Sequence, residues 1–345
     1  MGDNRKIWIV SDGIPGHVNT VRGLAAELSQ RSGLECVEYR LFSRYGLLTR
    51  WATTLLKRSG YAPSGMWRLS PVPDADQRPA LILSAGGRTG LANIALARKW
   101  GCPNAYFSSL RGLPASGFSA CFTILAEQAT AANIHLLPIS SSHVTAQAID
   151  EYGQSLRQTL DIEDPSPVWT ILLGGDAPGY RYLKQDWQAM ANGLSAASQK
   201  AGAKLLITGS RRTPQMAIDM LERVLPKDCI LRTQWEPSKQ PLDRLEAYLG
   251  AADQVIVTDD STSMISDSLL TRKPVTSLYP AIAGNALDRD QKIRQGFVAS
   301  GHLRRLPVQQ ADKLAAHWDD DFTALPADAE WTALDHLMPL LEINR

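Results

Sequence analysis

Residues Ser11 to Leu28, SDGIPGHVNTVRGLAAEL, decide how the first part of this chain folds. They follow KIWIV (6–10), a run of apolar and β-branched residues that predicts a buried strand. They lead into an amphipathic stretch, Val21–Leu28, that predicts a helix. A strand, a glycine-containing loop and a helix in this order predict an α/β unit, with the loop at a helix N-terminus that favours anions.

The loop itself combines flexibility with polar side chains. Gly13 and Gly16 allow a tight turn and the close approach of a ligand, while Asp12, His17 and Asn19 supply polar groups. An ordinary surface connection would have the same composition. The alternative is a phosphate or sugar site at the carboxyl end of a strand. Neither GxGxxG nor the GK[ST] ending of a P-loop is present in this loop.

Composition limits the class of protein. A chain of 345 residues with 44% hydrophobic residues is typical of about two folded domains. Its 36 Lys and Arg against 35 Asp and Glu do not favour a nucleic-acid partner. The four cysteines lack metal-like spacing, and no apolar run is long enough to span a membrane. We therefore expect a cytoplasmic protein that is not integral to a membrane, with no bound metal and no cofactor.

Strand-like runs alternate with helical stretches along the whole chain. The runs are KIWIV, ALILSAGG, NAYFSS, CFTILA, VWTILLGG, KLLITGS, CILRTQ, DQVIVTDD and PVTSLYP. This alternation predicts parallel sheets covered by helices on both faces. The proline-rich LDIEDPSPVW (160–169) is the best linker, so we predict two Rossmann-like domains, 1–163 and 164–320, facing each other across a cleft. A helical segment, 321–345, is expected to pack back on the domains.

Two further loops carry residues suited to phosphate. Arg211 and Arg212 follow a predicted strand directly, and paired guanidiniums suit a phosphate, although a solvated pair is the alternative. In DDSTSM either Asp260 or Ser261 can cap the next helix, which leaves N–H groups near Ser263 for a phosphate oxygen. Asp267 lies one turn further on the same face, where it can accept hydrogen bonds from ribose hydroxyls or remain an ordinary surface carboxylate.

Candidate catalytic groups are few. His17 is the only histidine in a candidate loop, and its ordinary pKa near 6.5 suits a base or a donor to phosphate. HExxH, GxSxG and paired Cys/His clusters are absent from the sequence, which does not favour a zinc protease or an α/β-hydrolase.

The segment from Tyr39 to Pro73 contains no Asp or Glu. Leu47, Trp51 and Leu55 share one helical face within it. A basic amphipathic helix can lie on anionic lipid, so residues 40–58 are a candidate for peripheral contact with the inner membrane face. A helix packed on its domain with snorkelling basic side chains is the alternative. The basic residues are Arg40, Arg44, Arg50, Lys57, Arg58 and Arg68.

Five motifs carry a family resemblance: DGIPGHVNTVRGLA, GGRTG, LLGG, TGSRRTP and VTDDSTSMISDSLLTRKPV. In order and spacing they resemble bacterial members of the mitochondrial fission (elongated mitochondria) protein family, which implies a GT-B-like fold. The organisation is also similar to the peptidoglycan glycosyltransferase that transfers N-acetylglucosamine from UDP to a lipid acceptor. The resemblance implies that the Gly13–His17 loop faces the acceptor, and that Asp267 replaces a ribose-binding Glu. In the family a Glu-His-Asp run commonly follows the CFTILA strand, whereas Glu127 is followed here by Gln128 and Ala129.

These observations favour a GT-B-like glycosyltransferase that uses a nucleotide-sugar as substrate. His17 or Asp12 would be the base, with Glu127 in reserve. The expected donor side comprises Gly174, Gly175, Ser210, Arg211, Arg212, Thr213, Asp260, Ser261, Ser263, Met264 and Asp267. The expected acceptor side comprises Gly13, Gly16, Asn19, Thr20, Gly86, Gly87, Arg88 and Thr89. The alternatives are a non-catalytic binding or scaffold protein with the same fold, favoured by the altered Glu127 segment, and a nucleotide-sugar epimerase.

Overall fold

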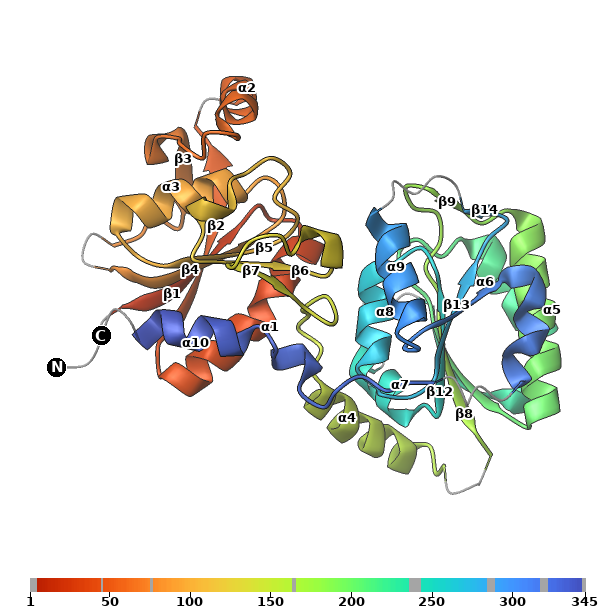
Figure 1. Cartoon of the computed structure of the whole chain (residues 1–345). Helices are drawn as coiled ribbons and strands as arrows, with labels where there is room; N and C mark the ends of the chain where they lie inside the picture. The colour runs from red at the N-terminus through yellow and green to blue at the C-terminus, as the bar shows by residue number, and fades with distance from the viewer. Residues whose placement is uncertain are drawn as a thin grey trace. The chain divides into compact units, whose positions relative to one another are not determined.

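The computed structural model describes residues 5–44, 46–74, 77–162, 166–235, 243–283, 289–316 and 322–342. The chain divides into two compact units (Figure 1). The first unit comprises Met1–His143 with Ala327–Arg345, and the second comprises Val144–Pro326. The domain boundaries that we predicted, at 163/164 and 320/321, lie outside the described residues.

Helix α4 (Ala146–Thr159), which we expected in the first domain, belongs to the second unit. The reason is its packing along α7 (Leu245–Ala251). The two helix backbones meet at a pair of glycines, Gly153 and Gly250, and a Cβ atom on either would overlap the backbone of the other helix. Such close approach between helices requires the absence of a side chain.

The first unit is built on a seven-stranded sheet with the order β3-β2-β1-β4-β5-β6-β7. All neighbouring strands are parallel except β3, which pairs antiparallel with β2. The strands are β1 (Lys6–Ser11), β2 (Cys36–Ser43), β3 (Trp67–Ser70), β4 (Pro79–Ala85), β5 (Asn104–Phe107), β6 (Ala120–Thr123) and β7 (Ile134–Leu136). The helices are α1 (Pro15–Ser32), α2 (Leu47–Leu56), α3 (Gly90–Trp100) and α10 (Leu334–Glu342), with short 3₁₀ turns η1 (Ser64–Met66), η2 (Ala115–Gly117), η3 (Ala126–Gln128) and η6 (Ala329–Trp331).

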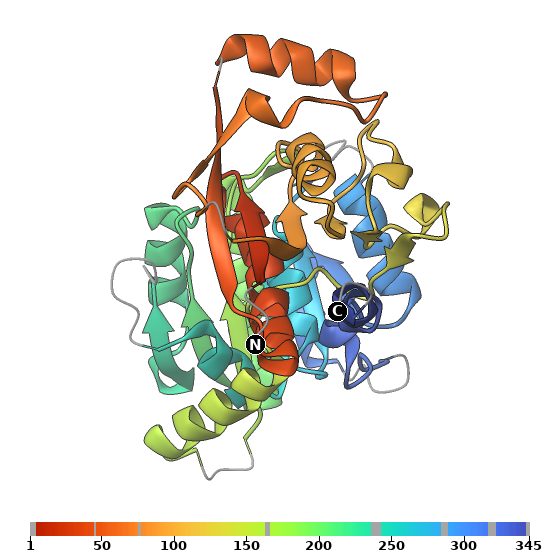
Figure 2. The same cartoon turned by 90° about the vertical axis from the view of Figure 1, so that its left-hand side faces the viewer.

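Helices cover both faces of this sheet, as predicted. Ile7 and Ile9 of β1 pack in the cluster that contains α1 and α10, whereas Trp8 packs in the cluster on the opposite face. Burial on both faces explains why β1 is a continuous apolar run. The C-terminal segment does pack back, because Leu334 and Leu337 of α10 are buried in the α1 cluster. Helix α2, the orange helix at the top of Figure 2, lies beyond β2 and β3 at the edge of the sheet.

The second unit is built on a six-stranded sheet with the order β11-β10-β8-β12-β13-β15, parallel throughout. Its strands are β8 (Val168–Leu172), β10 (Lys204–Thr208), β11 (Ile230–Gln234), β12 (Gln254–Thr258), β13 (Val275–Tyr279) and β15 (Arg304–Pro307), and β9 (Tyr180–Arg181) pairs separately with β14 (Ile282–Ala283). Besides α4 and α7 its helices are α5 (Lys184–Ala201), α6 (Gln215–Val224), α8 (Thr262–Leu269) and α9 (Arg289–Ala299), with 3₁₀ segments η4 (Lys227–Cys229) and η5 (Val308–Ala315). Buried side chains of α5 and α6 share one core with β8 and β10.

Each sheet has one point at which the chain reverses its progress across the strands. In the first unit this point lies between β1 and β4, and in the second it lies between β8 and β12. Open α/β sheets bind ligands outside the carboxyl ends of the strands at such a switch point. The loops that follow β1, β4, β8 and β12 are therefore placed for binding, and all four are among the loops singled out in the sequence.

None of the helices in the described parts of the chain combines the length and the hydropathy needed to cross a bilayer.

Candidate functional site

At the switch point of the first unit, His17 and Asp12 form a pair. The Nδ1 atom of His17 lies 2.9 Å from Oδ2 of Asp12. The imidazole also covers Gly86 of the loop after β4, where a Cβ atom would overlap the ring. Gly86 has a φ of +87°, a conformation that side chains other than glycine rarely adopt. The two predicted loops are thus joined through one histidine ring.

The pairing assigns different roles to the two groups. The side chain of Asp12 is only 5% exposed and its other oxygen accepts the N–H of Ile14, whereas the side chain of His17 is 38% exposed. A carboxylate can only accept, so the ring donates from Nδ1, and in the neutral imidazole the Nε2 atom then carries the lone pair. This is the arrangement of a base oriented by a carboxylate. Of the two bases that the sequence left open, His17 has the better geometry.

Several residues that we predicted on the acceptor side make hydrogen bonds within their own loop or helix. The hydroxyl of Thr89 lies 3.0 Å from the carbonyl oxygens of Ala85 and Gly86 and is fully buried. Thr20 donates to the carbonyl of Gly16 one turn earlier on α1. Asn19 accepts from Arg22 on the same helix. These three side chains therefore stabilise the backbone, while Arg88 is exposed in the loop after β4.

Glu127 lies apart from His17. It belongs to η3 after β6 and lines a cavity of about 310 Å³ that also contains Arg111 and Cys121. The end of β6 is three strands away from β1, about 14 Å at the usual strand spacing. Burial raises the pKa of the Cys121 thiol to about 12, so this cysteine is not a thiolate nucleophile.

In the second unit, the loops after β8 and β10 interlock. Thr213 Oγ1 accepts the N–H of Ser210 and lies 2.9 Å from the carbonyl oxygens of Leu173 and Gly174. Gly174 in turn donates its N–H to the hydroxyl of Thr258 at the end of β12. A Cβ atom on Gly175 would overlap the carbonyl of Arg212. Close packing against the backbone of Arg212 thus requires a glycine at position 175.

Arg212 connects this group to β12. Its guanidinium lies 2.7 Å from Oδ2 of Asp260, whose side chain is fully buried. Burial raises the pKa of Asp260, and the positive charge of Arg212 opposes that rise. A Cβ atom on Gly174 would overlap the same carboxylate. The arginine predicted to bind phosphate is therefore held by a carboxylate between the loop after β10 and the start of α8.

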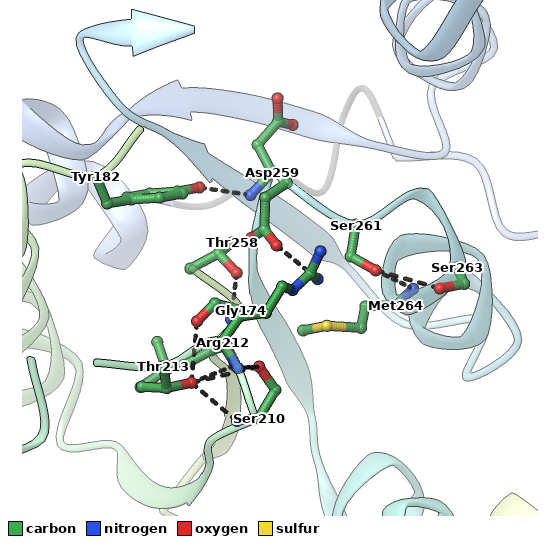
Figure 3. A network of polar contacts seen from close by, with 12 residues as sticks. Gly174, Tyr182, Ser210, Arg212, Thr213, Thr258, Asp259, Ser261, Ser263 and Met264 are labelled. Atoms are coloured by element: carbon green, nitrogen blue, oxygen red, sulfur yellow. Dashed lines mark hydrogen bonds and ion pairs between the residues drawn. The ribbon is translucent and has the colours of Figure 1, made fainter. Parts of the chain in front are cut away.

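Helix α8 begins as the sequence suggested. Ser261 is its N-cap and accepts the N–H of Met264, which settles the choice between Asp260 and Ser261. The hydroxyl of Ser261 also lies 3.2 Å from that of Ser263 (Figure 3). Backbone N–H groups in the first turn of a helix lack partners within the helix and attract anions. Asp267, the predicted ribose ligand, lies on α8 and is largely buried. Arg211, in the loop before α6, is exposed.

The sequence reasoning missed a buried network around Asp259. This carboxylate accepts hydrogen bonds from Arg305, Tyr180 and Ser277. Arg294, only 1% exposed, lies 3.6 Å from it and over the ring of Tyr180. Burial and the neighbouring Asp259 raise the pKa of Tyr180, which stays a neutral donor. The available signal was the first Asp of TDDS, but its partners come from four separate elements, β9, β13, α9 and β15.

Solved structures resemble this chain over nearly its whole length. S. aureus MnaA with UDP is 12% identical, with 98% of this chain and 97% of MnaA covered and a TM-score of 0.60. Acinetobacter baumannii MurG is 13% identical, with 98% and 99% covered and a TM-score of 0.55. The Methanocaldococcus jannaschii UDP-GlcNAc 2-epimerase with UDP-GlcNAc and UDP is 10% identical, with 97% and 99% covered and a TM-score of 0.53. A comparison with curated proteins found no match.

Two Rossmann-like units with these likenesses define a GT-B fold, which confirms the fold class expected from the sequence. The family model described as Mitochondrial fission ELM1 matches residues 15–327. The chain belongs to that family, as its motifs indicated. A fold of this kind hosts more than one chemistry, so the function has to be argued from the site.

Proposed function

We propose that this protein is a glycosyltransferase that uses a nucleotide-sugar donor. The second unit would bind the donor and the first unit the acceptor. The single observation that carries the proposal is the His17 and Asp12 pair, a base oriented by a carboxylate at a ligand-binding switch point. The fold shared with proteins solved with UDP or UDP-GlcNAc supports the choice of donor class.

The donor diphosphate would lie at the start of α8. Its charge would meet the N–H groups of the first turn, Arg212 held by Asp260, and the exposed Arg211. The glycines Gly174 and Gly175 leave room for the carboxylate of Asp260 and for the backbone of Arg212, which hold this part of the rim together. The helix end and the two guanidiniums would stabilise the leaving nucleoside diphosphate, so the reaction we propose does not call on a metal ion. Asp267 on α8 is our candidate for the ribose.

The acceptor hydroxyl would be activated by His17. Its Nε2 atom takes the hydroxyl proton while the oxygen forms a bond to the anomeric carbon, and the bond from that carbon to the diphosphate oxygen breaks. The bonding electrons leave with the nucleoside diphosphate. Asp12 stabilises the imidazolium that results, at 2.9 Å from Nδ1.

The test is calorimetric titration and thermal unfolding with UDP, GDP, dTDP, CMP and their sugars. A ligand at a hundred times its dissociation constant adds about 2.7 kcal/mol of stability. We expect one nucleotide to bind selectively, and Arg211→Ala/Arg212→Ala to abolish binding. Arg223→Ala, which removes an exposed arginine from α6, is the control and should bind normally. No binding of any nucleotide would overturn the donor site and favour a scaffold protein.

Turnover separates a transferase from an epimerase. A transferase releases nucleoside diphosphate in proportion to the acceptor supplied, whereas an epimerase converts the nucleotide-sugar without an acceptor. We expect His17→Ala to abolish transfer with nucleotide affinity retained, because His17 and the donor residues are in different units. Full activity of both His17→Ala and Asp12→Asn would show that the base is assigned wrongly.

We also propose that α2 contacts an anionic membrane surface. Trp51 and Leu55 share one face of this helix and are 73% and 80% exposed, while Leu56 packs against the first unit. Lys57 and Arg58 follow directly, in a segment without acidic residues from Tyr39 to Pro73. Exposed aromatic and aliphatic side chains beside basic ones suit a headgroup layer of anionic lipid.

Vesicle flotation tests this contact. We expect binding to vesicles that contain phosphatidylglycerol and none to pure phosphatidylcholine, with Trp51→Ala/Leu55→Ala and Lys57→Glu/Arg58→Glu both abolishing it. Met216→Ala removes an exposed apolar side chain from α6 and serves as the control. Equal binding to neutral vesicles, or binding that survives both double substitutions, would refute the proposal.

A further inference from the structure

The buried carboxylate of Asp259 has no acceptor site left for Arg294. Each of its oxygens accepts two hydrogen bonds: Oδ1 from Ser277 and from Nε of Arg305, and Oδ2 from Tyr180 and from Nη2 of Arg305. Because an ionised carboxylate offers about four lone-pair sites, its capacity is filled. The Nε atom of Arg294 lies 3.6 Å from Oδ2, which is beyond hydrogen-bond distance.

Arg294 is therefore a buried cation with unused hydrogen-bond donors. Its side chain is 1% exposed, and its Nε and Nη1 atoms have no hydrogen-bond partner in the parts of the chain that the structure describes. The ring of Tyr180, 5.0 Å from the guanidinium carbon, supplies only a weak attraction. Two guanidiniums, those of Arg294 and Arg305, thus share one carboxylate. A buried charge of this kind is costly unless a ligand provides the missing anion.

A cavity of about 550 Å³ adjoins this group, between α9 and the ends of β13 and β15. Arg305 lines the cavity from β15, and Gln291 and Val298 line it from α9. Arg294 lies three residues after Gln291 and four before Val298, so it is next to both on the surface of the helix. Because Arg294 and Arg305 contact the same oxygen of Asp259, one further anion at this wall can contact both guanidiniums.

The other walls of the cavity suit a hydroxylated ligand. The Oε1 atom of Gln291 is buried and has no hydrogen-bond partner among the described residues, so it requires a donor such as a hydroxyl group. The ring of Tyr279 lies 5.1 Å from the guanidinium of Arg305 and adds an aromatic surface. The volume is in the range of small-molecule sites. A compound that offers a carboxylate to the guanidiniums and a hydroxyl to the amide is a sugar acid.

We propose that this cavity binds the sugar of the donor, and that this sugar carries a carboxylate held by Arg294 and Arg305. The inference rests on the proposed function, which places the donor diphosphate at the start of α8. Asp260, which holds Arg212 there, follows Asp259 directly in the chain. The strand β13 is the neighbour of β12, about 4.8 Å away, so a sugar bonded to the diphosphate reaches the cavity. The substrate class is then a nucleotide-linked uronic acid, whose carboxylate balances the second guanidinium.

The test compares UDP-glucuronate with UDP-glucose, which differ only in a carboxylate against a hydroxymethyl group. In calorimetric titration we expect the unaltered chain to bind UDP-glucuronate about tenfold more tightly or better. Arg294→Met removes the charge and keeps an extended side chain, and Gln291→Glu places a carboxylate at the cavity wall, so both should abolish this preference. Arg223→Met, at an exposed position of α6, is the matched control and should retain it. Equal affinity for the two sugars in the unaltered chain, or a preference that survives both substitutions, would overturn the inference.

UDP alone distinguishes the sugar from the diphosphate and reports on folding. Replacing a buried charge by an apolar side chain is often neutral or stabilising, so Arg294→Met should fold. We expect this variant to bind UDP as the unaltered chain does. If it weakens UDP and UDP-glucuronate equally, the guanidinium serves the diphosphate, and the assignment to the sugar is wrong.

Free sugars separate this inference from the proposed function. If UDP does not bind the unaltered chain, the proposed function fails, and saturation-transfer NMR with glucuronate and glucose still tests the cavity. Binding of glucuronate alone, lost in Arg294→Met, would support a site for a sugar acid. Binding of both sugars alike, or of neither, would contradict it.

Discussion

The guanidinium of Arg212 lies 2.7 Å from the buried carboxylate of Asp260, and this ion pair joins the loop after β10 to the loop after β12. The pair places a cation beside the start of α8. Since the charges of the two residues offset each other, the positive field for an anion comes mainly from the helix end and from Arg211. Asp260 thus positions the side chain of Arg212.

Arg212→Ala should destabilise the chain in a pH-dependent manner. Without the guanidinium, the folded-state pKa of Asp260 rises further above its unfolded value near 3.9, because burial already raises it. Stability from such a group is present below the unfolded pKa and is lost as pH rises through the folded pKa. We expect little effect near pH 4 and a loss of about 1–3 kcal/mol at pH 8 in urea unfolding. A loss that is largest at pH 4 would contradict this assignment.

Gly174→Ala should disturb the donor site through Asp260. The added Cβ atom overlaps the carboxylate and forces it from Arg212. We expect nucleotide affinity to fall at least tenfold and stability to fall by about 1–3 kcal/mol. Gly296→Ala is the control, because this position on α9 has open space and alanine should stabilise the helix by about 0.5–1 kcal/mol. If Gly174→Ala binds the nucleotide with unchanged affinity, the position of the Asp260 carboxylate does not matter for nucleotide binding.

Gly86→Ala should displace His17. The Cβ atom overlaps the imidazole, and the φ of +87° adds backbone strain of about 1 kcal/mol. We expect transfer activity to fall at least a hundredfold while nucleotide binding to the second unit stays the same. Gly65→Ala, where no heavy atom lies within 4 Å, should be neutral in both assays. Equal activity of the two variants would mean that the position of the ring does not matter.

Asp259→Ala should be the most destabilising of these substitutions. It leaves Arg294, at 1% exposure, with a buried charge and no ion pair to another carboxylate in the described parts of the chain. Breaking a buried pair in this way costs about 3–5 kcal/mol, measured as the shift in urea unfolding. Asp228→Ala, at an exposed position, is expected to change stability by less than about 0.5 kcal/mol. A similarly small effect of Asp259→Ala would show that the network does not hold the fold.

Strands that are buried on both faces were the predictable part of the fold. Every apolar run identified in the sequence contains a strand, from β1 to β13, and most of these strands are fully buried, which demands continuous hydrophobicity. The strands β2, β3, β7, β9, β14 and β15 were missed. In β2, Glu38 and Arg40 interrupt the apolar pattern, and β15 is the charged run RRLP at a sheet edge. An edge strand has solvent on one side and so carries a weaker signal.

The site was predictable to the extent that its residues follow strands directly. Gly174, Ser210, Thr213 and Thr258 meet because the carboxyl ends of parallel strands lie along one rim. The buried partners of Asp259 come from β9, β13, α9 and β15, and no local pattern joins them.

By itself the sequence determined two α/β units with parallel sheets, the loops that would carry function, and membership of one family. These properties depend on local periodicity and on short motifs, which neighbouring residues specify. Only the tertiary structure decided that His17 and Asp12 form a hydrogen-bonded pair, that Arg212 is held by Asp260, and that α4 belongs with the second unit. Those outcomes depend on contacts between residues distant in the chain, whose geometry is set when the strands assemble into sheets.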